Sequence, residues 1–315
     1  MSNLKLINMR DVEVEPICWL WYPFIPYGKV TIIQGDPGEG KTTLVLQIIA
    51  RLTKGESIID EDESLPINVI YQTAEDGLSD TIKPRLLAVN ADCSKVLVID
   101  DSDTPLTMRD ARLEQAIIET NAKLVVLDPI QGFLGADVDM HRANEIRPIM
   151  KHISELAEKY KCAIILIGHM NKCSVGKSAY RGLGSIDFQA AARSVLIVGR
   201  IKDEPEIRVV CQTKSSLAPE AKAVAFRLSE ENGFEWVGEY DVSADDLLSG
   251  TAKGTKKQAA MDFLESLLSG GQMSQTEIME LAERKSIAEK TLRNAKEALG
   301  IKSKRENNQW YWSLD

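Results

Sequence analysis

Cysteine pairs, long apolar runs and an excess of positive charge are all missing from this sequence, and each absence excludes a class of protein. The five cysteines in 315 residues form no C-x-x-C pair, so neither a zinc site nor a disulfide framework is indicated. No uninterrupted apolar run approaches the roughly 20 residues of a membrane span. Residues 1–10 lack the apolar core of a signal peptide. We therefore expect reduced thiols, a cytoplasmic location and no membrane partner.

Positive charge is scarce overall but unevenly distributed. The net charge of −9 argues against a chain that coats nucleic acid indiscriminately. Residues 251–315 nevertheless carry 11 Lys and Arg against 9 Asp and Glu, a net charge of +2, which leaves −11 for residues 1–250. With 44% hydrophobic and 27% charged residues, the chain suits about two globular domains. An acidic body with a mildly basic tail fits a motor that carries a small nucleic-acid module.

A glycine-rich stretch, GDPGEGKT at residues 35–42, satisfies the phosphate-binding pattern G-x-x-x-x-G-K-[ST]. β-Branched and apolar residues precede it, as in a buried parallel strand, and residues 44–52 read as a helix. This order aims backbone N–H groups and the positive end of a helix dipole at an anion. We predict that the loop binds ATP, with Lys41 on the β- and γ-phosphates and the Thr42 hydroxyl on Mg²⁺. The predicted nucleotide-binding residues are Gly35, Asp36, Pro37, Gly38, Glu39, Gly40, Lys41, Thr42 and Thr43.

Acidic residues follow the second predicted strand, residues 68–72. Glu75 would lie at the C-terminal end of a strand beside the phosphate-binding strand, where ligands of open α/β sheets bind. It is our candidate for the residue that polarises the attacking water. Glu75 could instead be an acid near the start of the helix predicted over residues 78–90, although Asp76 suits that capping role better.

Two later strands end in polar side chains that the same site could use. Residues 123–127 run into Asp128, the pattern of a Walker B strand whose carboxylate holds Mg²⁺ through its water shell. Residues 163–168 lead to His169, which could sense the γ-phosphate through a hydrogen bond. A lone histidine is also often purely structural.

The remaining pattern completes an α/β fold with a mostly parallel sheet. Apolar periodicity predicts a helix whose buried face runs from residue 146 to residue 157, and a second helix over residues 108–120. Aromatic residues near the start of the chain could stack on a base, but packing is their more usual role. A Gly/Ser/Lys-rich segment, residues 172–185, reads as a loop, and the last strands would pair antiparallel. Further strands are predicted at residues 95–100, 194–198, 207–212, 223–228 and 234–237.

In this order and spacing, GDPGEGKT, Glu75, Asp128 and His169 make the chain resemble the RecA-like P-loop ATPase superfamily over roughly residues 15–240. It looks most like the hexameric replicative helicases of the plasmid RepA type and related phage- and prophage-encoded ATPases. That narrower resemblance rests on YQTAED at 71–76, GHMNK at 168–172, Arg181-Gly182 and Ala192-Arg193.

The resemblance implies that ATP lies between subunits of a hexameric ring, where an arginine of one subunit reaches the γ-phosphate bound by its neighbour. Arg193 stands at the matching place, with Arg181 and Lys214 as alternatives. Arg193 could also be an ordinary solvated arginine. The resemblance further implies that Lys172, Lys177 and Arg181 contact single-stranded DNA in the central channel.

The last part of the sequence has a composition of its own. Residues 241–256 are polar and read as a linker. Beyond them, three helices and two strands are predicted, and Ser274-Gln275-Thr276-Glu277 forms a capping box. This order resembles a winged helix-turn-helix over residues 257–315, a module that binds DNA or docks proteins. The candidate DNA-binding residues are Lys290, Arg293, Asn294 and Lys296 on the recognition helix and Lys302, Lys304 and Arg305 in the wing.

The sequence therefore predicts an ATPase domain (1–240), a linker (241–256) and a winged helix (257–315) that together form an ATP-driven DNA motor. The specific hypothesis is a replicative helicase of a plasmid, phage or integrated element. A recombination or loading ATPase that does not unwind DNA needs the same ATP site and stays open. So does a DNA-binding regulator that ATP merely switches.

Overall fold

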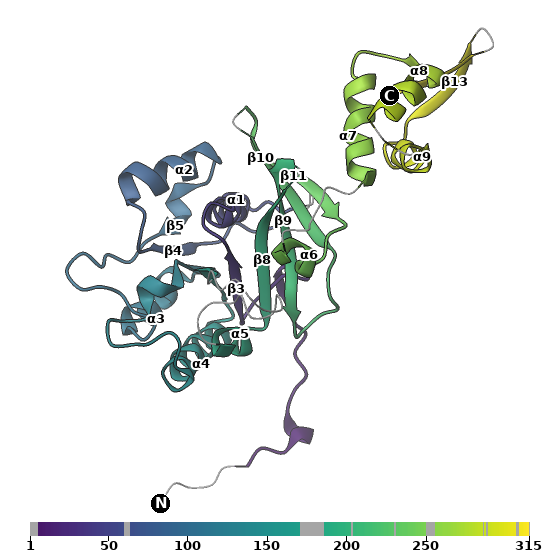
Figure 1. Ribbon diagram of the computed structural model, residues 1–315. Coiled ribbons are helices and arrows are strands. Elements are labelled where there is room, and N and C mark those ends of the chain that lie inside the picture. Colours follow the sequence, from purple (N-terminus) through teal and green to yellow (C-terminus); the bar gives the residue numbers. More distant parts are fainter. Residues whose placement is uncertain are drawn as a thin grey trace, which may run out of the picture.

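The structure, a computed structural model, is built on one large twisted sheet with helices on both faces (Figure 1). It describes residues 6–59, 64–170, 186–202, 204–229, 231–249, 256–285, 287, 289–306 and 309–314. The predicted DNA-binding residues Lys172, Lys177 and Arg181 lie outside this part of the chain. No helix in the described part of the chain is long and apolar enough to cross a membrane.

The large sheet has nine strands in the order β11-β10-β9-β8-β3-β7-β6-β4-β5. The six strands from β8 to β5 run parallel, and β9, β10 and β11 continue the sheet antiparallel. This confirms the predicted α/β fold with a mostly parallel sheet. The strands are β3 (Val30–Gly35), β4 (Val69–Thr73), β5 (Val96–Leu97), β6 (Leu124–Asp128), β7 (Ala163–His169), β8 (Ser194–Ile201), β9 (Glu204–Ser215), β10 (Ala223–Ser229) and β11 (Gly233–Tyr240).

Alternation along the parallel strands divides the core into two layers. Ile33, Tyr71 and Val126 face α1 (Lys41–Lys54) and α2 (Lys83–Ala88). Ile32 and Val125 face the other layer, made of α3 (Ala111–Thr120), α4 (Ala143–Tyr160) and α5 (Ile186–Ala191). Because helices cover both faces, all six residues of β3 are buried, including the polar Thr31 and Gln34.

Two regions differ from the sequence-based expectation. The strand predicted over residues 95–100 is only Val96–Leu97, a short edge strand. Within the predicted linker, Ala244–Ser249 form the helix α6, whose Leu247 and Leu248 are buried in the core formed with β8, β9 and β10. The polar composition of the linker hid this pair of leucines, and their burial makes residues 244–249 part of the sheet domain.

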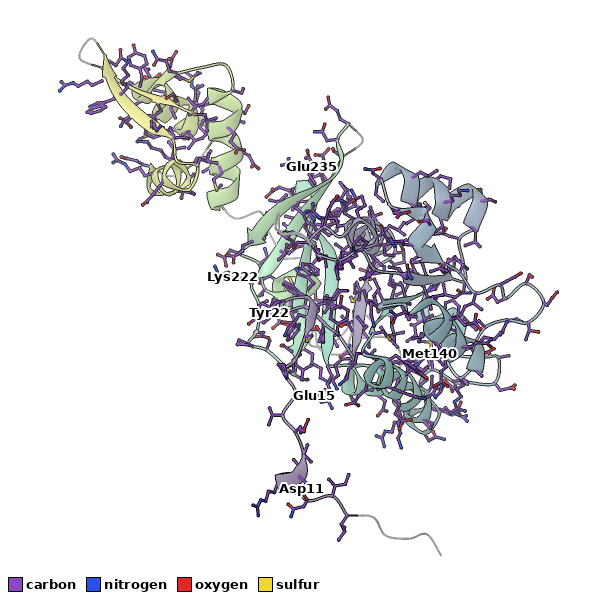
Figure 2. All side chains as sticks on the ribbon, turned by 180° about the vertical axis from the view of Figure 1, so that it is seen from behind. Asp11, Glu15, Tyr22, Met140, Lys222 and Glu235 are labelled. Carbon is purple, nitrogen blue, oxygen red and sulfur yellow. The ribbon has the colours of Figure 1, made fainter. Side chains whose placement is uncertain are left out.

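The chain enters the sheet domain through an exposed segment. Among residues 6–17, the one-turn helix Met9–Asp11 buries no residue. Figure 2 shows Asp11 well outside the body of the domain. Of the aromatics that follow, Trp21 of β1 (Trp19–Trp21) and Phe24, just before β2 (Ile25–Pro26), are buried and their rings contact each other, whereas Tyr22 is 63% exposed.

The C-terminal residues form a second, separate core. Apolar residues of three helices and one strand, among them Leu264, Ile278, Leu292 and Trp312, pack together. Ser274 caps the second of these helices by accepting a hydrogen bond from the Glu277 backbone N–H, as the capping box predicts. The elements are α7 (Lys256–Leu268), β12 (Met273–Ser274), α8 (Gln275–Arg284), α9 (Glu289–Ala298), β13 (Lys302–Glu306) and β14 (Gln309–Ser313).

Candidate functional site: a nucleotide-binding edge of the sheet

The predicted chemistry gathers at the carboxyl edge of the parallel strands. Across this edge, β3 ends in the phosphate-binding loop, β7 ends at His169, β6 ends at Asp128, and β4 runs into Glu75. Since β3, β7, β6 and β4 are consecutive in the sheet, residues far apart in sequence come together here.

The phosphate-binding loop depends on glycine at specific points. Gly38 and Gly40 have φ angles of 79° and 89°, and the helix α1 begins directly after Gly40. A Cβ on Gly35 would lie 2.2 Å from the Val198 carbonyl oxygen, so a side chain there would force apart β3 and β8. The loop is thus a cradle of backbone at the start of a buried helix, which is how phosphates are bound in proteins.

Lys41 lies inside this cradle. Its ammonium donates to the carbonyl oxygens of Gly35, at 2.9 Å, and Asp36, at 2.8 Å. The residue is only 4% exposed, and burial lowers the pKa of Lys41 while the nearby Asp128 and Asp36 oppose that shift. A buried cation whose hydrogen bonds to the described residues go to neutral carbonyls is well placed to turn toward an anionic phosphate.

Thr42, Asp128 and Tyr71 form a hydrogen-bonded group beside the loop. The Thr42 hydroxyl donates to Asp128 Oδ2 at 2.7 Å, and the Tyr71 hydroxyl donates to the same oxygen at 2.9 Å. Burial raises the pKa of Asp128, and the two hydrogen bonds counteract it. Burial next to this carboxylate also raises the pKa of Tyr71, so that its hydroxyl remains a donor.

This donor set suits Mg²⁺. A hydroxyl and a carboxylate within 2.7 Å of each other are the kind of hard oxygen ligands that magnesium takes, and Mg²⁺ usually keeps most of its waters and adds only one or two protein oxygens. A divalent cation would also offset the burial that disfavours the charged form of Asp128. Thr42 and Asp128 therefore fit their predicted role.

Glu75 and His169 face each other across the edge. Glu75 Oε2 lies 3.8 Å from His169 Nε2, and the Glu75 side chain is 65% exposed, open to solvent and substrate. His169 Nδ1 is buried without a hydrogen-bond partner among the described residues. The capping role expected of Asp76 is wrong: Gly77 occupies the cap position, and the Asp76 carboxylate pairs with Arg85 at 3.0 Å.

A pocket of about 570 Å³ opens beside Thr43, at the end of the phosphate-binding loop. Its walls come from α1, from α2 and from the β10–β11 hairpin, and they include the apolar Leu46, Val89 and Leu228. No sequence motif predicts where the base of a nucleotide would lie. A pocket with apolar walls next to Thr43 is a surface against which the base of a nucleotide could pack.

Arg193 and Lys214 lie far from this edge. The Arg193 backbone N–H bonds the carbonyl of Val30, at the opposite end of β3 from the phosphate-binding loop. Lys214 donates to the carbonyl oxygens of Gln189 and Ala190. Neither residue can reach a phosphate held by its own chain, so a role for either one requires a second copy.

The candidate DNA-binding residues of the C-terminal core lie on α9 and β13. Lys290 and Asn294 are positions on α9, whereas Lys302 and Lys304 are exposed on β13. Arg293 is paired with Glu289 at 2.6 Å. Lys296 stacks over the Trp312 ring at 4.5 Å, and burial lowers the pKa of Lys296.

Sequence reasoning missed two polar residues of the site. Tyr71 looks like any aromatic strand residue, and only the pairing of Thr73 with Asp128 reveals that its hydroxyl lies near the carboxylate. Arg200 lies two residues beyond the predicted end of its strand, and its guanidinium reaches the Gly38 carbonyl. Neither has a local sequence signal, because both depend on strand register.

Comparison with known proteins agrees with this geometry. Residues 3–175, more than half of the chain, match the family model described as "AAA domain". The chain belongs to this family. Its similarity to RadA and RecA proteins, together with its fold, places this AAA-domain protein in the RecA-like P-loop ATPase superfamily.

Named relatives match parts of the chain at low identity. A DNA repair protein RadA of Halalkalibacterium halodurans is 29% identical over a match that covers 46% of the chain and 28% of that protein. A RecA protein of Agrobacterium fabrum is 25% identical over 76% of the chain and 67% of its own length. The chain spans 60% of the RecA protein of Sinorhizobium medicae.

A solved structure shares the fold. A KaiC-like protein from Pyrococcus horikoshii superposes with a TM-score of 0.52 at 16% identity, over 70% of the chain and 99% of that protein. At this identity the likeness concerns the fold alone. The RecA-like ATPase thus shares its sheet architecture with a protein of quite different sequence.

Proposed function

We propose that this ATPase hydrolyses ATP to drive movement on, or remodelling of, single-stranded DNA, and that it acts as a replicative-type helicase of a plasmid, phage or integrated element. The observation that carries the ATPase chemistry is the hydrogen-bonded group of Thr42, Asp128 and Tyr71 beside Lys41, on the same sheet edge as Glu75 and His169. A magnesium-binding oxygen pair, a phosphate cradle and a solvent-open acid are what phosphoryl transfer to water requires.

Each residue has a role in this proposal. When nucleotide binds, the Lys41 ammonium gives up its hydrogen bonds to the carbonyls of Gly35 and Asp36 and donates to phosphate oxygens instead, whose negative charge it neutralises. Glu75 orients the attacking water. His169, whose Nε2 lies 3.8 Å from Glu75 Oε2, links the state of the γ-phosphate to the segment that follows β7. Magnesium, held by Thr42 and Asp128, would supply charge neutralisation between the phosphates.

Arg193 acts in trans in this proposal. Because it lies at the opposite end of β3 from the phosphate loop, a neighbouring copy must bring it, or Lys214 in its place, to the nucleotide. Such a shared site is the basis for the proposed ring, which we take to be hexameric and cytoplasmic. Turnover then depends on protein concentration.

DNA as the partner is supported by the named relatives and by the C-terminal core. One relative is named a DNA repair protein and others are RecA proteins. Three helices followed by a β-hairpin, with Lys302 and Lys304 exposed on β13, suit a winged helix-turn-helix on DNA. The relatives' names also favour a second candidate, a RecA-type recombination or loading ATPase that binds DNA without unwinding it.

The decisive experiment measures ATP hydrolysis with and without single-stranded DNA at several protein concentrations. We expect DNA to stimulate turnover, the specific activity to rise with concentration, and Glu75→Gln to abolish hydrolysis while nucleotide still binds. Lys41→Ala serves as the control that loses nucleotide binding. Turnover that neither DNA nor concentration changes would contradict the motor and leave a nucleotide-switched regulator.

A forked-duplex assay then separates the two DNA functions. Strand displacement that requires ATP hydrolysis supports the helicase. DNA-stimulated hydrolysis without displacement, under conditions that support full turnover, supports the recombination or loading ATPase instead.

A further inference from the structure

The phosphate-binding loop carries two acidic residues, Asp36 and Glu39, in a place that must accept a polyanion. Glu39 is the more unusual of the two. Its side chain is only 20% exposed, and its Oε2 atom is buried without a hydrogen-bond partner among the described residues. A carboxylate in this position repels a triphosphate unless a cation compensates it, because a buried charge is poorly screened by solvent.

Arg200 provides such a cation. It stands near the end of β8, the strand that pairs with β3, and its Nε atom lies 4.0 Å from Glu39 Oε2. Its Nη2 atom donates to the Gly38 carbonyl at 3.4 Å. One guanidinium therefore contacts both the backbone and the acidic side chain of the phosphate-binding loop.

The position of Arg200 is itself costly, which indicates that the contact matters. Directly opposite Arg200 in the β8–β9 ladder is a second arginine, Arg208, which is only 8% exposed. Like charges opposite each other destabilise a pair of strands. Burial and the charge of Arg200 lower the pKa of Arg208, whereas Glu39 favours its charged form. The two guanidinium groups and the Glu39 carboxylate thus form one electrostatic group beside the loop.

We propose that Arg200 is a positioning residue for the nucleotide: it neutralises Glu39 and holds Gly38, so that the loop of the same chain accepts a nucleoside triphosphate. This role rests on the proposed function, since it assumes that the loop binds ATP. It differs from the role of Arg193, because Arg200 acts within one chain and does not require a neighbour.

The test is a double-mutant cycle on nucleotide affinity. Binding of a fluorescent N-methylanthraniloyl derivative of ATP, with Mg²⁺, is measured for the wild type, Arg200→Ala, Glu39→Gln and the double variant. Arg200→Ala should weaken binding by about tenfold, because the Glu39 charge is then uncompensated. Glu39→Gln alone should tighten binding, and in the double variant it should restore most of the affinity.

Arg227→Ala is the matched control. Arg227 pairs with Glu235 at 3.6 Å and is 37% exposed, close to the 42% of Arg200, but among the described residues it makes no ion pair with the phosphate-binding loop. It should bind the nucleotide like the wild type. Arg200→Lys should recover part of the affinity, because it keeps the charge and loses the planar fork.

Three outcomes would overturn the assignment. If Arg200→Ala lowers kcat but leaves affinity unchanged, Arg200 touches the reacting phosphate rather than positioning the loop. If the double variant binds no better than Arg200→Ala, Glu39 is not what Arg200 compensates. If Glu39→Gln weakens binding in a folded protein, the carboxylate helps rather than hinders, and this result does not depend on how well Arg200→Ala folds. Failure of the wild type to bind the nucleotide would instead reject the proposed function.

Discussion

Asp128, the proposed magnesium ligand, shows how a single site residue can lower the stability of the protein that carries it. Burial raises its pKa in the folded state. The folded protein therefore retains a proton on Asp128 at pH values where the unfolded chain has lost it. The free energy of unfolding consequently falls as pH rises above the ordinary carboxyl range. The hydrogen bonds from Thr42 and Tyr71 reduce this penalty but do not cancel it.

Asp128→Asn should stabilise the nucleotide-free protein while it abolishes hydrolysis. The amide oxygen can still accept the bonds from Thr42 and Tyr71, but no charge is buried. We expect the free energy of unfolding at pH 7 to rise by about 1 kcal/mol, or about 2–4 °C in Tm. Thermal melts in a pH series that starts at the ordinary carboxyl pKa of 3.8 and proceeds upward should also show a smaller decline in Tm for the variant.

Asp92→Asn is the control for this experiment. Asp92 is a partly exposed acid whose pKa is lowered by hydrogen bonds from Ser94, so its contribution to stability is present above the ordinary carboxyl range and is lost as pH falls. This variant should not raise Tm. An Asp128→Asn protein that melts at or below the wild-type Tm at pH 7 would contradict the argument.

At the scale of elements, the sequence best predicts the helices and strands whose own residues carry a complete periodic or apolar pattern. The β-branched run of β3, the apolar run of β6 and the 3.6-residue periodicity of α4 each indicate their element without reference to the rest of the chain. The phosphate-binding loop and the ends of β6 and β7 follow from these elements, and so do Lys41, Asp128 and His169.

What the sequence could not predict depends on contacts between elements. Leu247 and Leu248 lie in a polar stretch, and only the sheet beneath them shows that they are buried. The pairing of β8 with β9 extends both strands beyond their predicted ends and brings Arg200 to the loop. The Tyr71 hydroxyl bond to Asp128 depends on strand register in the same way.

Leu247→Ala tests whether α6 belongs to the sheet domain. Leu247 is 9% exposed, and Gly199 of β8 lies so close to it that an added Cβ would come within 3.0 Å of its Cγ. Removing this side chain should lower the free energy of unfolding by about 2–3 kcal/mol. Urea denaturation measures the change. Leu65→Ala, at a leucine that is 85% exposed, should have almost no effect.

An effect of Leu247→Ala no larger than that of Leu65→Ala would mean that α6 detaches from the sheet in solution. Residues 241–256 would then all act as a linker, as the sequence predicts.

At the scale of the whole molecule, the chain has a sheet domain with its own core and a C-terminal group of elements with another. The apolar residues of α7, α8, α9 and β14 pack with one another. The two parts should therefore fold independently, with the boundary after α6.

Truncation tests this boundary and the role of the C-terminal part together. A chain that ends at residue 249 should keep the Tm of the sheet domain and its nucleotide binding, and it should bind DNA more weakly than the full chain. A chain that ends at residue 240 should melt at a lower temperature, because it loses Leu247 and Leu248. Fluorescence anisotropy at fixed salt measures whether the chain that ends at residue 249 binds DNA more weakly than the full chain. Equal DNA affinity of the 249 truncation and the full chain would favour a protein-docking role for the C-terminal part.

The path by which the chain leaves the sheet domain has a mechanical consequence. After β11, at the far end of the sheet, the chain returns across β9 and β8 as α6 before it continues to the C-terminal part. Leu247 rests on Gly199, the residue next to Arg200, whose guanidinium contacts the phosphate-binding loop. If the proposed ATP site is correct, a load that pulls on the C-terminal part would act on the strand beside the phosphate-binding loop and not on the outer edge of the sheet, and turnover should then depend on tension.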